Sequence, residues 1–130
     1  MGEVSPRSGC GTSSSVLSKQ SGYGCHDQHA CGGGSGAPCS AEIAHGKAYG
    51  ALAMGMGSRA LFQRAQEQAY FIGAVNTLAQ GRMVPVPGGV LILDGAVLLG
   101  AVGVSGDTSD NDEACAIAGI EAAGLKPNAG

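Results

Sequence analysis

Two side chains that lie two residues apart in this 130-residue chain, His45 and Lys47, have the chemistry to bind a ligand. A neutral imidazole is the commonest metal ligand among side chains. A lysine ammonium group can meet a carboxylate of a ligand as a point charge. Each also has a structural interpretation, since a lone histidine is more often satisfied by a neighbour and Lys47 could pair with a carboxylate such as Asp112. The sequence leaves both interpretations open.

The turn Pro87-Gly88-Gly89 is a second place where a ligand could approach the backbone closely, because glycine has no side chain to block it. A plain connection between two strands is the more economical interpretation. A thioether ligand is less attractive, since methionine readily fills gaps in a core that has only 4% aromatic residues. The methionines concerned are Met54, Met56 and Met83.

The five cysteines of the chain have no repeated spacing, which argues against a disulfide framework and favours free thiols. Residues 25–31 hold two cysteines and two histidines, and thiolate with imidazole is the ligand set that zinc prefers. Their spacing matches no standard zinc template, so we favour a loop without metal. Cys115 has alanine on both sides and is expected to be buried and unreactive. We find no acid and base that are paired by their spacing.

The charge and hydropathy of the chain exclude several classes of function. It carries 7 basic and 10 acidic residues, without the clustered positive charge of a nucleic-acid surface. Its apolar stretches are broken well short of the roughly 20 residues that span a bilayer. The first 20 residues lack the apolar run of a secretion signal. We therefore expect a cytoplasmic protein with a small-molecule ligand, and neither nucleic acid nor membrane as a partner.

The composition changes near residue 38. Residues 1–37 are rich in Ser, Gly and Cys and lack hydrophobic periodicity, which predicts a segment that is disordered or only loosely attached. Residues 38–130 consist of apolar segments separated by turn residues, and we place the folded domain there. A chain of this length has room for one small core, which excludes separate cofactor and substrate domains.

Apolar residues at helical spacing predict two helices at the start of the domain. The first covers residues 40–56, where Gly46 and Gly50 indicate that a neighbouring element packs very close. The second covers residues 59–68, with Ser58 as its N-cap.

The last helix has the clearest signal in the chain. Ser109 as N-cap with Asp112 three residues later is typical of a capping box, and Gly124 supplies the stop. Pro127 prevents the helix from resuming. The apolar segment 70–78 is too short for its spacing to distinguish helix from strand.

The residues between these helices predict extended structure. Residues 83–86 and 90–93 are rich in branched side chains, and Asp94-Gly95 is the signal for a tight type I′ hairpin. The returning strand covers residues 96–104, where glycines indicate a bulge or close approach of a helix. This order of elements predicts an α+β fold with helices covering an antiparallel sheet.

Three motifs, in their order along the chain, resemble those of a known family. They lie at residues 42–51, at residues 85–92, and at residues 100–108 with 110–114. With them the chain resembles the haem-binding family that includes the GlcG-like and HbpS-like proteins and the C-terminal domain of PduO, over residues 36–124. Three ordered motifs are a much stronger signal than one glycine-rich phrase.

The resemblance implies a profilin-like fold with α/β/α layers, assembly into homo-oligomers, and haem or another tetrapyrrole as the ligand. Some members degrade haem slowly, by oxidation at the metal. On this basis His45 is the candidate iron ligand, and Lys47, Pro87, Gly88 and Gly89 are the candidate cofactor-binding residues. Two alternatives stay open: an accessory protein that binds a small organic acid or a corrinoid, and a ligand-free assembly module. Whether the protein is an enzyme also stays open.

The N-terminal segment departs from the family, which ordinarily begins with a helix and a pair of hydrophobic strands. Those apolar strands are missing from the pattern of residues 1–37, so we expect a sheet that lacks two strands and leaves an exposed edge. The segment is either a genuine part of the fold or the product of an altered reading frame. Sequencing the gene again distinguishes the two.

Overall fold

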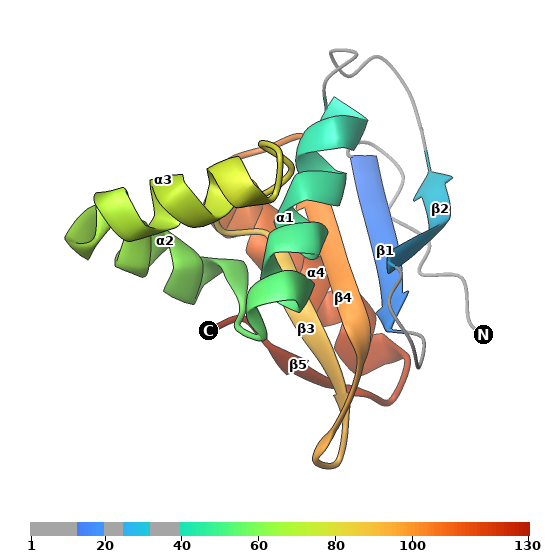
Figure 1. The fold of residues 1–130 in the computed structure, drawn as a ribbon. Helices are drawn as coiled ribbons and strands as arrows, with labels where there is room; N and C mark the ends of the chain where they lie inside the picture. The colour runs from blue at the N-terminus through green and yellow to red at the C-terminus, as the bar shows by residue number, and fades with distance from the viewer. Residues whose placement is uncertain (1–12, 20–24, 32–39) are drawn as a thin grey trace.

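The computed structural model describes residues 13–19, 25–31 and 40–130, with side chains from residue 42 onward. In these ranges the chain forms a five-stranded sheet and four helices (Figure 1). The strands are β1 (Ser13–Lys19), β2 (Cys25–Cys31), β3 (Gly89–Asp94), β4 (Val97–Ser105) and β5 (Lys126–Asn128). The helices are α1 (Ser40–Met54), α2 (Ser58–Glu67), α3 (Ala69–Leu78) and α4 (Ser109–Ala122).

The sheet is antiparallel, with the strand order β2-β1-β4-β3-β5, and helices cover both of its faces (Figure 1). Successive residues of a strand face opposite sides, so β3 and β4 supply two cores. The core under α1 is built mainly from alanine: Ala48, Ala51, Leu91 and Ala101. The core under α4 is built from branched side chains: Val90, Val102, Val104, Ala116 and Ile120. The predicted α+β architecture with helical layers on both sides is confirmed.

The small residues of α1 let this helix lie very close to its neighbours. A Cβ atom added to Gly103 of β4 would overlap the carbonyl oxygen of Ala44. A Cβ atom added to Gly46 would lie 2.5 Å from Cγ2 of Val84 and 3.0 Å from the carbonyl oxygen of Arg82. The predicted close approach of another element is therefore confirmed at Gly46 and at a glycine of β4. At Gly50 an added Cβ atom would make only ordinary contact, with Cδ1 of Leu61 at 3.4 Å.

Two glycines of α1 offer a matched test of this packing. Gly46→Ala should lower the free energy of unfolding by about 1–3 kcal/mol, because the new methyl group has no room. Gly50→Ala should leave it unchanged or raise it by up to about 1 kcal/mol, since its Cβ would lie 3.4 Å from Cδ1 of Leu61 and alanine favours a helix. Urea unfolding of the two variants measures the difference. Equal stability of both would contradict the close packing at Gly46.

The expectation of a sheet without its two N-terminal strands is wrong. β1 pairs with β4 from Ser13 to Ser18, and β2 pairs with the other side of β1. A strand is held in a sheet by backbone hydrogen bonds, so a serine-rich sequence without an alternating apolar pattern can still occupy this place. The prediction of a disordered or loosely attached segment over residues 1–37 is not tested by these two strands and stays a prediction. The boundary between residues 37 and 38 stays a prediction.

The predicted strand at residues 83–86 is also wrong. This segment is irregular, and the backbone N–H of Val84 donates to the carbonyl oxygen of Gly46 in α1 at 3.1 Å. Pro85 and Pro87 have no N–H to donate, so the segment cannot form a regular ladder. It serves instead as a connection that packs along α1 before β3 begins.

The hairpin between β3 and β4 is present, but its turn lies one residue later than predicted. Asp94 pairs with Val97, which leaves Gly95 and Ala96 as the two turn residues. Gly95 has a φ of 60°, and Ala96 is not among the residues with positive φ. Positive φ at the first position alone is the type II′ pattern rather than the type I′ pattern. The register shifts once between Ile92 and Leu93, as expected of a bulge.

The observed helix boundaries agree with the predicted ones better than the observed N-caps do. Residues 70–78, left ambiguous above, are helical as part of α3. Thr108, not Ser109, caps α4, because its Oγ1 accepts a hydrogen bond from the backbone N–H of Asn111 at 3.3 Å. Ser58 is the first residue of α2, and Gly57 is the N-cap without a side-chain bond. Both predicted N-caps are therefore one residue away from the observed ones.

Candidate functional site

The ammonium group of Lys47 is buried where α1 passes the start of α4. Its Nζ lies 2.9 Å from Oδ2 of Asp112 and donates to the carbonyl oxygen of Val104 at the same distance. The side chains of Lys47 and Asp112 are only 3% and 2% exposed. The other carboxylate oxygen of Asp112 accepts a hydrogen bond from the backbone N–H of Asp107 at 3.0 Å. The structural interpretation of Lys47, a pair with Asp112, is confirmed, and it joins the helical layers on the two faces of the sheet.

The turn Pro87-Gly88-Gly89 is buried against this ion pair. Gly88 has a φ of 124°, and a Cβ atom there would lie 2.9 Å from Nζ of Lys47. A Cβ atom on Gly89 would overlap the backbone carbonyl of Lys47. The backbone N–H of Gly89 donates to Oγ of the fully buried Ser58 at 2.6 Å. Glycine at these two positions is thus explained by the close packing of α1 against the start of β3.

His45 lies on a different side of α1 from Lys47, because two residues of a helix are about 200° apart. The ring of His45 is half-buried and stacks on the ring of Tyr49, with 6.4 Å between the centroids and 12° between the planes. The guanidinium group of Arg82 lies over the ring of Tyr49, with its Cζ atom 4.8 Å from the ring centroid. The predicted site residues therefore form two groups, one around Lys47 and one around His45.

The group of His45, Tyr49 and Arg82 combines three kinds of chemistry on the outer side of α1. An imidazole can ligate a metal ion, an aromatic ring provides a flat apolar surface, and a guanidinium group recognises carboxylates. Arg82 is exposed, and its Nε donates to the carbonyl oxygen of Ala79 at 2.9 Å, which holds one edge of its guanidinium group in place. Such a group suits a planar ligand that carries a metal and carboxylates.

Two of these three residues were not among the sequence-predicted site residues. Tyr49 lies four residues after His45, so helical spacing alone places both on one side of α1. Arg82 lies in the connection after α3, and no local signal in the sequence brings it to α1. The contact depends on the packing of residues 82–84 against Gly46, which only the folded chain reveals.

A further group of charges ties the starts of α2 and α4 together. Nε of Arg59 donates to both carboxylate oxygens of Glu113 at 2.9 Å, and its Nη2 pairs with Asp110. The hydrogen bonds that Arg59 donates to Asp110 and then to Glu113 raise the pKa of Arg59 above its ordinary value. The acidic side chains at the start of α4 repel anions, so a phosphate site at this helix start is disfavoured. We interpret this group as structural.

The remaining candidates contribute no site. Among the described residues, no group of His, Cys, Asp or Glu side chains could hold a metal ion. The side chains of residues 25–31, considered above for zinc, lie outside the described part. Cys115 is exposed, contrary to the expectation that it is buried. The buried face of α4 carries Asp112, Ala116 and Ile120 at intervals of four, and Cys115 lies off that face.

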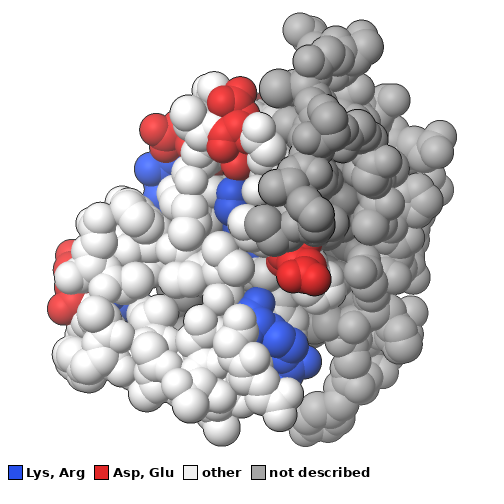
Figure 2. Space-filling model, turned by 90° about the horizontal axis from the view of Figure 1, so that it is seen from above, with Lys and Arg blue, Asp and Glu red and all other residues white. Residues whose placement is uncertain are grey.

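Within the described residues, no helix is both long and apolar enough to cross a bilayer. Figure 2 shows one face of the molecule, where the described surface is mostly uncharged and the basic side chains occur in small separate groups. That face therefore offers no extended basic surface of the kind that binds nucleic acid.

Comparison with known proteins identifies the family. The family model of the haem-degrading HbpS-like proteins matches residues 25–121. This chain belongs to the HbpS-like family. The match includes all three motifs, so the family that they predicted is confirmed. A search of curated protein sequences found no significant match.

Solved structures share the fold of this HbpS-like chain. The crystal structure of the PduOC:haem complex matches with a TM-score of 0.74 and 22% sequence identity. The matched region covers 88% of this chain and 79% of the PduOC chain. Protein ORFY of Klebsiella pneumoniae has a TM-score of 0.73 and 20% identity, with coverages of 86% and 74%. A double mutant of HbpS from Streptomyces reticuli has a TM-score of 0.70 and 20% identity, with coverages of 87% and 71%. These likenesses confirm the predicted fold.

The residues of this HbpS-like chain can be tested for their fit to haem. Haem needs an axial ligand to its iron, a flat apolar contact for its ring and partners for its propionates. His45 and Tyr49 of α1, with Arg82 packed on Tyr49, offer one of each. Lys47 does not fit as a propionate partner, because its ammonium group is buried and bound to Asp112 and Val104. The side-chain chemistry of His45, Tyr49 and Arg82 is therefore compatible with haem, whereas that of Lys47 is not.

Proposed function

We propose that this HbpS-like protein binds haem on the outer side of α1, with His45 as the iron ligand. The observation that carries the proposal is the stacked His45 and Tyr49 pair with the guanidinium group of Arg82 over it. Membership of a family named for haem degradation supports haem as the ligand class. The likeness of the fold to the PduOC:haem complex supports it independently.

Each of the three residues has a distinct role in this proposal. The imidazole of His45 would hold the iron through a ring nitrogen. The ring of Tyr49 stacks on the imidazole and would offer an apolar surface to the porphyrin. The exposed guanidinium group of Arg82 would bind a propionate through its two Nη groups, since its Nε already donates to the carbonyl oxygen of Ala79. Haem, when bound, supplies redox chemistry at its iron, and we propose slow haem degradation as a second activity on the basis of the family.

Lys47, Pro87, Gly88 and Gly89 have an indirect role in the proposed site. They fix α1 against β3 and α4 through the buried ion pair and the close backbone packing. His45 and Tyr49 are carried by the same helix, so this packing sets where the two rings lie. The four residues are positioning residues for the cofactor and do not touch it.

Thermal unfolding of the protein with a series of ligands tests the proposal. Haemin at about 100 times its dissociation constant should stabilise the fold by about 2.7 kcal/mol, which raises the melting temperature by several degrees. Iron-free protoporphyrin IX should stabilise it less, because His45 then has no metal to bind. A protein of similar size that does not bind haem serves as the control. Stabilisation by the iron-free ring equal to that by haemin would contradict iron ligation.

The same measurement separates the alternatives. An accessory protein for a small organic acid or a corrinoid should be stabilised by one of those ligands and not by haemin. A ligand-free assembly module should show no shift with any of them. Either result would overturn the haem proposal.

We propose two further properties with the haem function. The protein works in the cytoplasm, a location supported by the exposed free thiol of Cys115, since reducing compartments preserve such thiols. It also assembles into a homo-oligomer, which the resemblance to the family implies.

A further inference from the structure

The side chain of Asn76 in α3 binds the backbone of Met83 through both ends of its amide group. Its Nδ2 donates to the carbonyl oxygen of Met83, and its Oδ1 accepts a hydrogen bond from the backbone N–H of Met83, each at 3.0 Å. Met83 is only 2% exposed, so the loss of these two bonds would leave buried backbone groups unsatisfied. Asn76 thus takes the place of a neighbouring strand, because its amide offers a donor and an acceptor together.

The residue before Met83 is Arg82, the proposed partner of a propionate. The backbone N–H and the Nε of Arg82 both donate to the carbonyl oxygen of Ala79, at 3.3 and 2.9 Å. After Met83, the backbone N–H of Val84 donates to α1 at 3.1 Å. The backbone is therefore held on both sides of Met83, and the guanidinium group of Arg82 lies over the ring of Tyr49.

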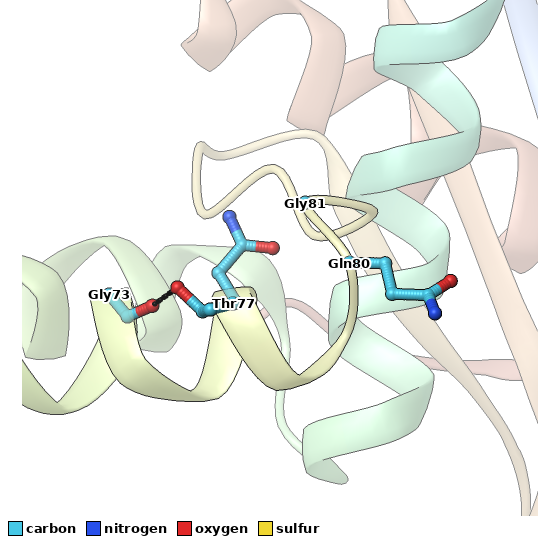
Figure 3. Close-up of a pocket in the computed structure, with 5 residues that line it drawn as sticks. Gly73, Thr77, Gln80 and Gly81 are labelled. Atoms are coloured by element: carbon cyan, nitrogen blue, oxygen red, sulfur yellow. Dashed lines mark hydrogen bonds between the residues drawn. The ribbon is translucent and has the colours of Figure 1, made fainter.

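The outer side of this connection is not supported by packing. A shallow hollow of about 410 Å³ lies beside it, lined by Gly73, Asn76, Thr77, Gln80 and Gly81 (Figure 3). In the described part of the chain, a Cβ atom added to Gly73 or Gly81 would meet nothing within 4 Å. Gln80 has a φ of 60°, a conformation that a residue other than glycine keeps only where its surroundings fix it. The hydroxyl of Thr77 does not help, because it is turned back to the carbonyl oxygen of Gly73 at 2.9 Å.

We propose that Asn76 is a positioning residue for Arg82, and that it thereby makes the site selective for tetrapyrroles with free carboxylates. The inference rests on the proposed function, in which Arg82 binds a propionate. An exposed ion pair gains little when a long side chain must first be ordered. Because Asn76 fixes the backbone next to Arg82, part of this ordering is complete before the ligand arrives. Asn76 itself does not touch the ligand, since its amide is bound to Met83.

The position of Arg82 can be measured without haemin. Nuclear Overhauser effects between the side chain of Arg82 and the ring of Tyr49 should be present in the full chain, because the guanidinium group lies over that ring. Asn76→Ala should remove or weaken them. Thr77→Ala is the matched control in the same turn of α3, and it should leave them unchanged because it loses only a bond within the helix. Equal signals in both variants, or none in the unmodified chain, would overturn the proposal.

Haemin and haemin dimethyl ester measure the selectivity, since the ester keeps the ring and the iron but has no carboxylate. The full chain should bind haemin about three- to fivefold more tightly than the ester, and Arg82→Ala should remove most of this preference. Asn76→Ala should lower the ratio as far as Arg82→Ala does, with the Soret band unmoved because His45 is intact. The double variant should lower it no further, because Asn76 acts through Arg82. A merely structural role would weaken both compounds equally and leave the ratio unchanged.

A second pair of variants covers the case in which circular dichroism shows that Asn76→Ala is unfolded. The carboxylate of Asn76→Asp can still accept from the N–H of Met83 but cannot donate to its carbonyl oxygen. Thr77→Asp is the control for the added charge. A folded Asn76 variant with the ratio of the unmodified chain would overturn the inference and leave haem binding standing. Failure of the unmodified chain to bind either compound would instead overturn the proposed function, and the selectivity with it.

Discussion

Replacing Lys47 with methionine should lower the free energy of unfolding by about 3–5 kcal/mol. The substitution removes the ammonium group that satisfies Oδ2 of Asp112 and the carbonyl oxygen of Val104, and it leaves the carboxylate buried without its counter-charge. Burial of an unpaired charge is among the costliest changes that a single substitution can make. A domain of this size has about 5–15 kcal/mol of stability, so the variant should unfold at a much lower urea concentration.

Two further variants show whether the loss comes from the ion pair. Lys126→Met makes the same chemical change at an exposed position and should alter the stability by no more than about 0.5 kcal/mol. The double variant Lys47→Met with Asp112→Asn removes both charges. It should regain a large part of the stability, because no charge is then buried without a partner. A loss at Lys47 no larger than the loss at Lys126 would contradict the structural role of the pair.

Replacing His45 with alanine should weaken haemin binding at least about tenfold and remove the visible absorption band of the ligated iron. The loss of groups that merely orient a metal ligand costs about 10–100-fold in metal affinity, so the loss of the ligand itself should cost no less. His45 is half-buried and is not one of the residues of the alanine core, so the variant should remain folded. Absorption spectroscopy of the haemin complex measures the effect.

The control for His45 is its stacking neighbour. Tyr49→Phe keeps the aromatic ring and removes a hydroxyl group that the proposal does not use, so the absorption band should persist. Added imidazole should restore the band of the His45→Ala complex, because the free base can occupy the position of the missing side chain. A His45→Ala complex with an unchanged spectrum would remove His45 from the site.

The motifs could be assigned from the sequence because they consist of residue types at short, fixed spacings. Glycine at positions 46 and 103 indicated close backbone contact, and the structure places both residues against neighbouring backbone. The Lys47 and Asp112 pair could be suggested but not decided, since 65 residues separate them. Nothing local distinguishes a buried ion pair from a ligand-binding lysine, and the fold decides between them.

Other features depended on contacts that no local pattern records. Ser58 has the residue type of an N-cap, yet its hydroxyl accepts a hydrogen bond from Gly89, 31 residues away. The strands β1 and β2 have polar sequences, and their place in the sheet follows from the open backbone edge of β4. Arg82 reaches Tyr49 because the connection after α3 packs on α1. These three cases are tertiary in origin, which is why the sequence pattern missed them.

The most direct test of the haem proposal is a titration of the full-length chain with haemin, followed by visible absorption. The sample is first shown to be folded by circular dichroism, and free haemin and a protein that does not bind haem serve as controls. Haem bound through His45 predicts a saturable, shifted Soret band that reaches its end point at one haem for each chain. A folded sample that gives no saturable band would contradict the proposed function.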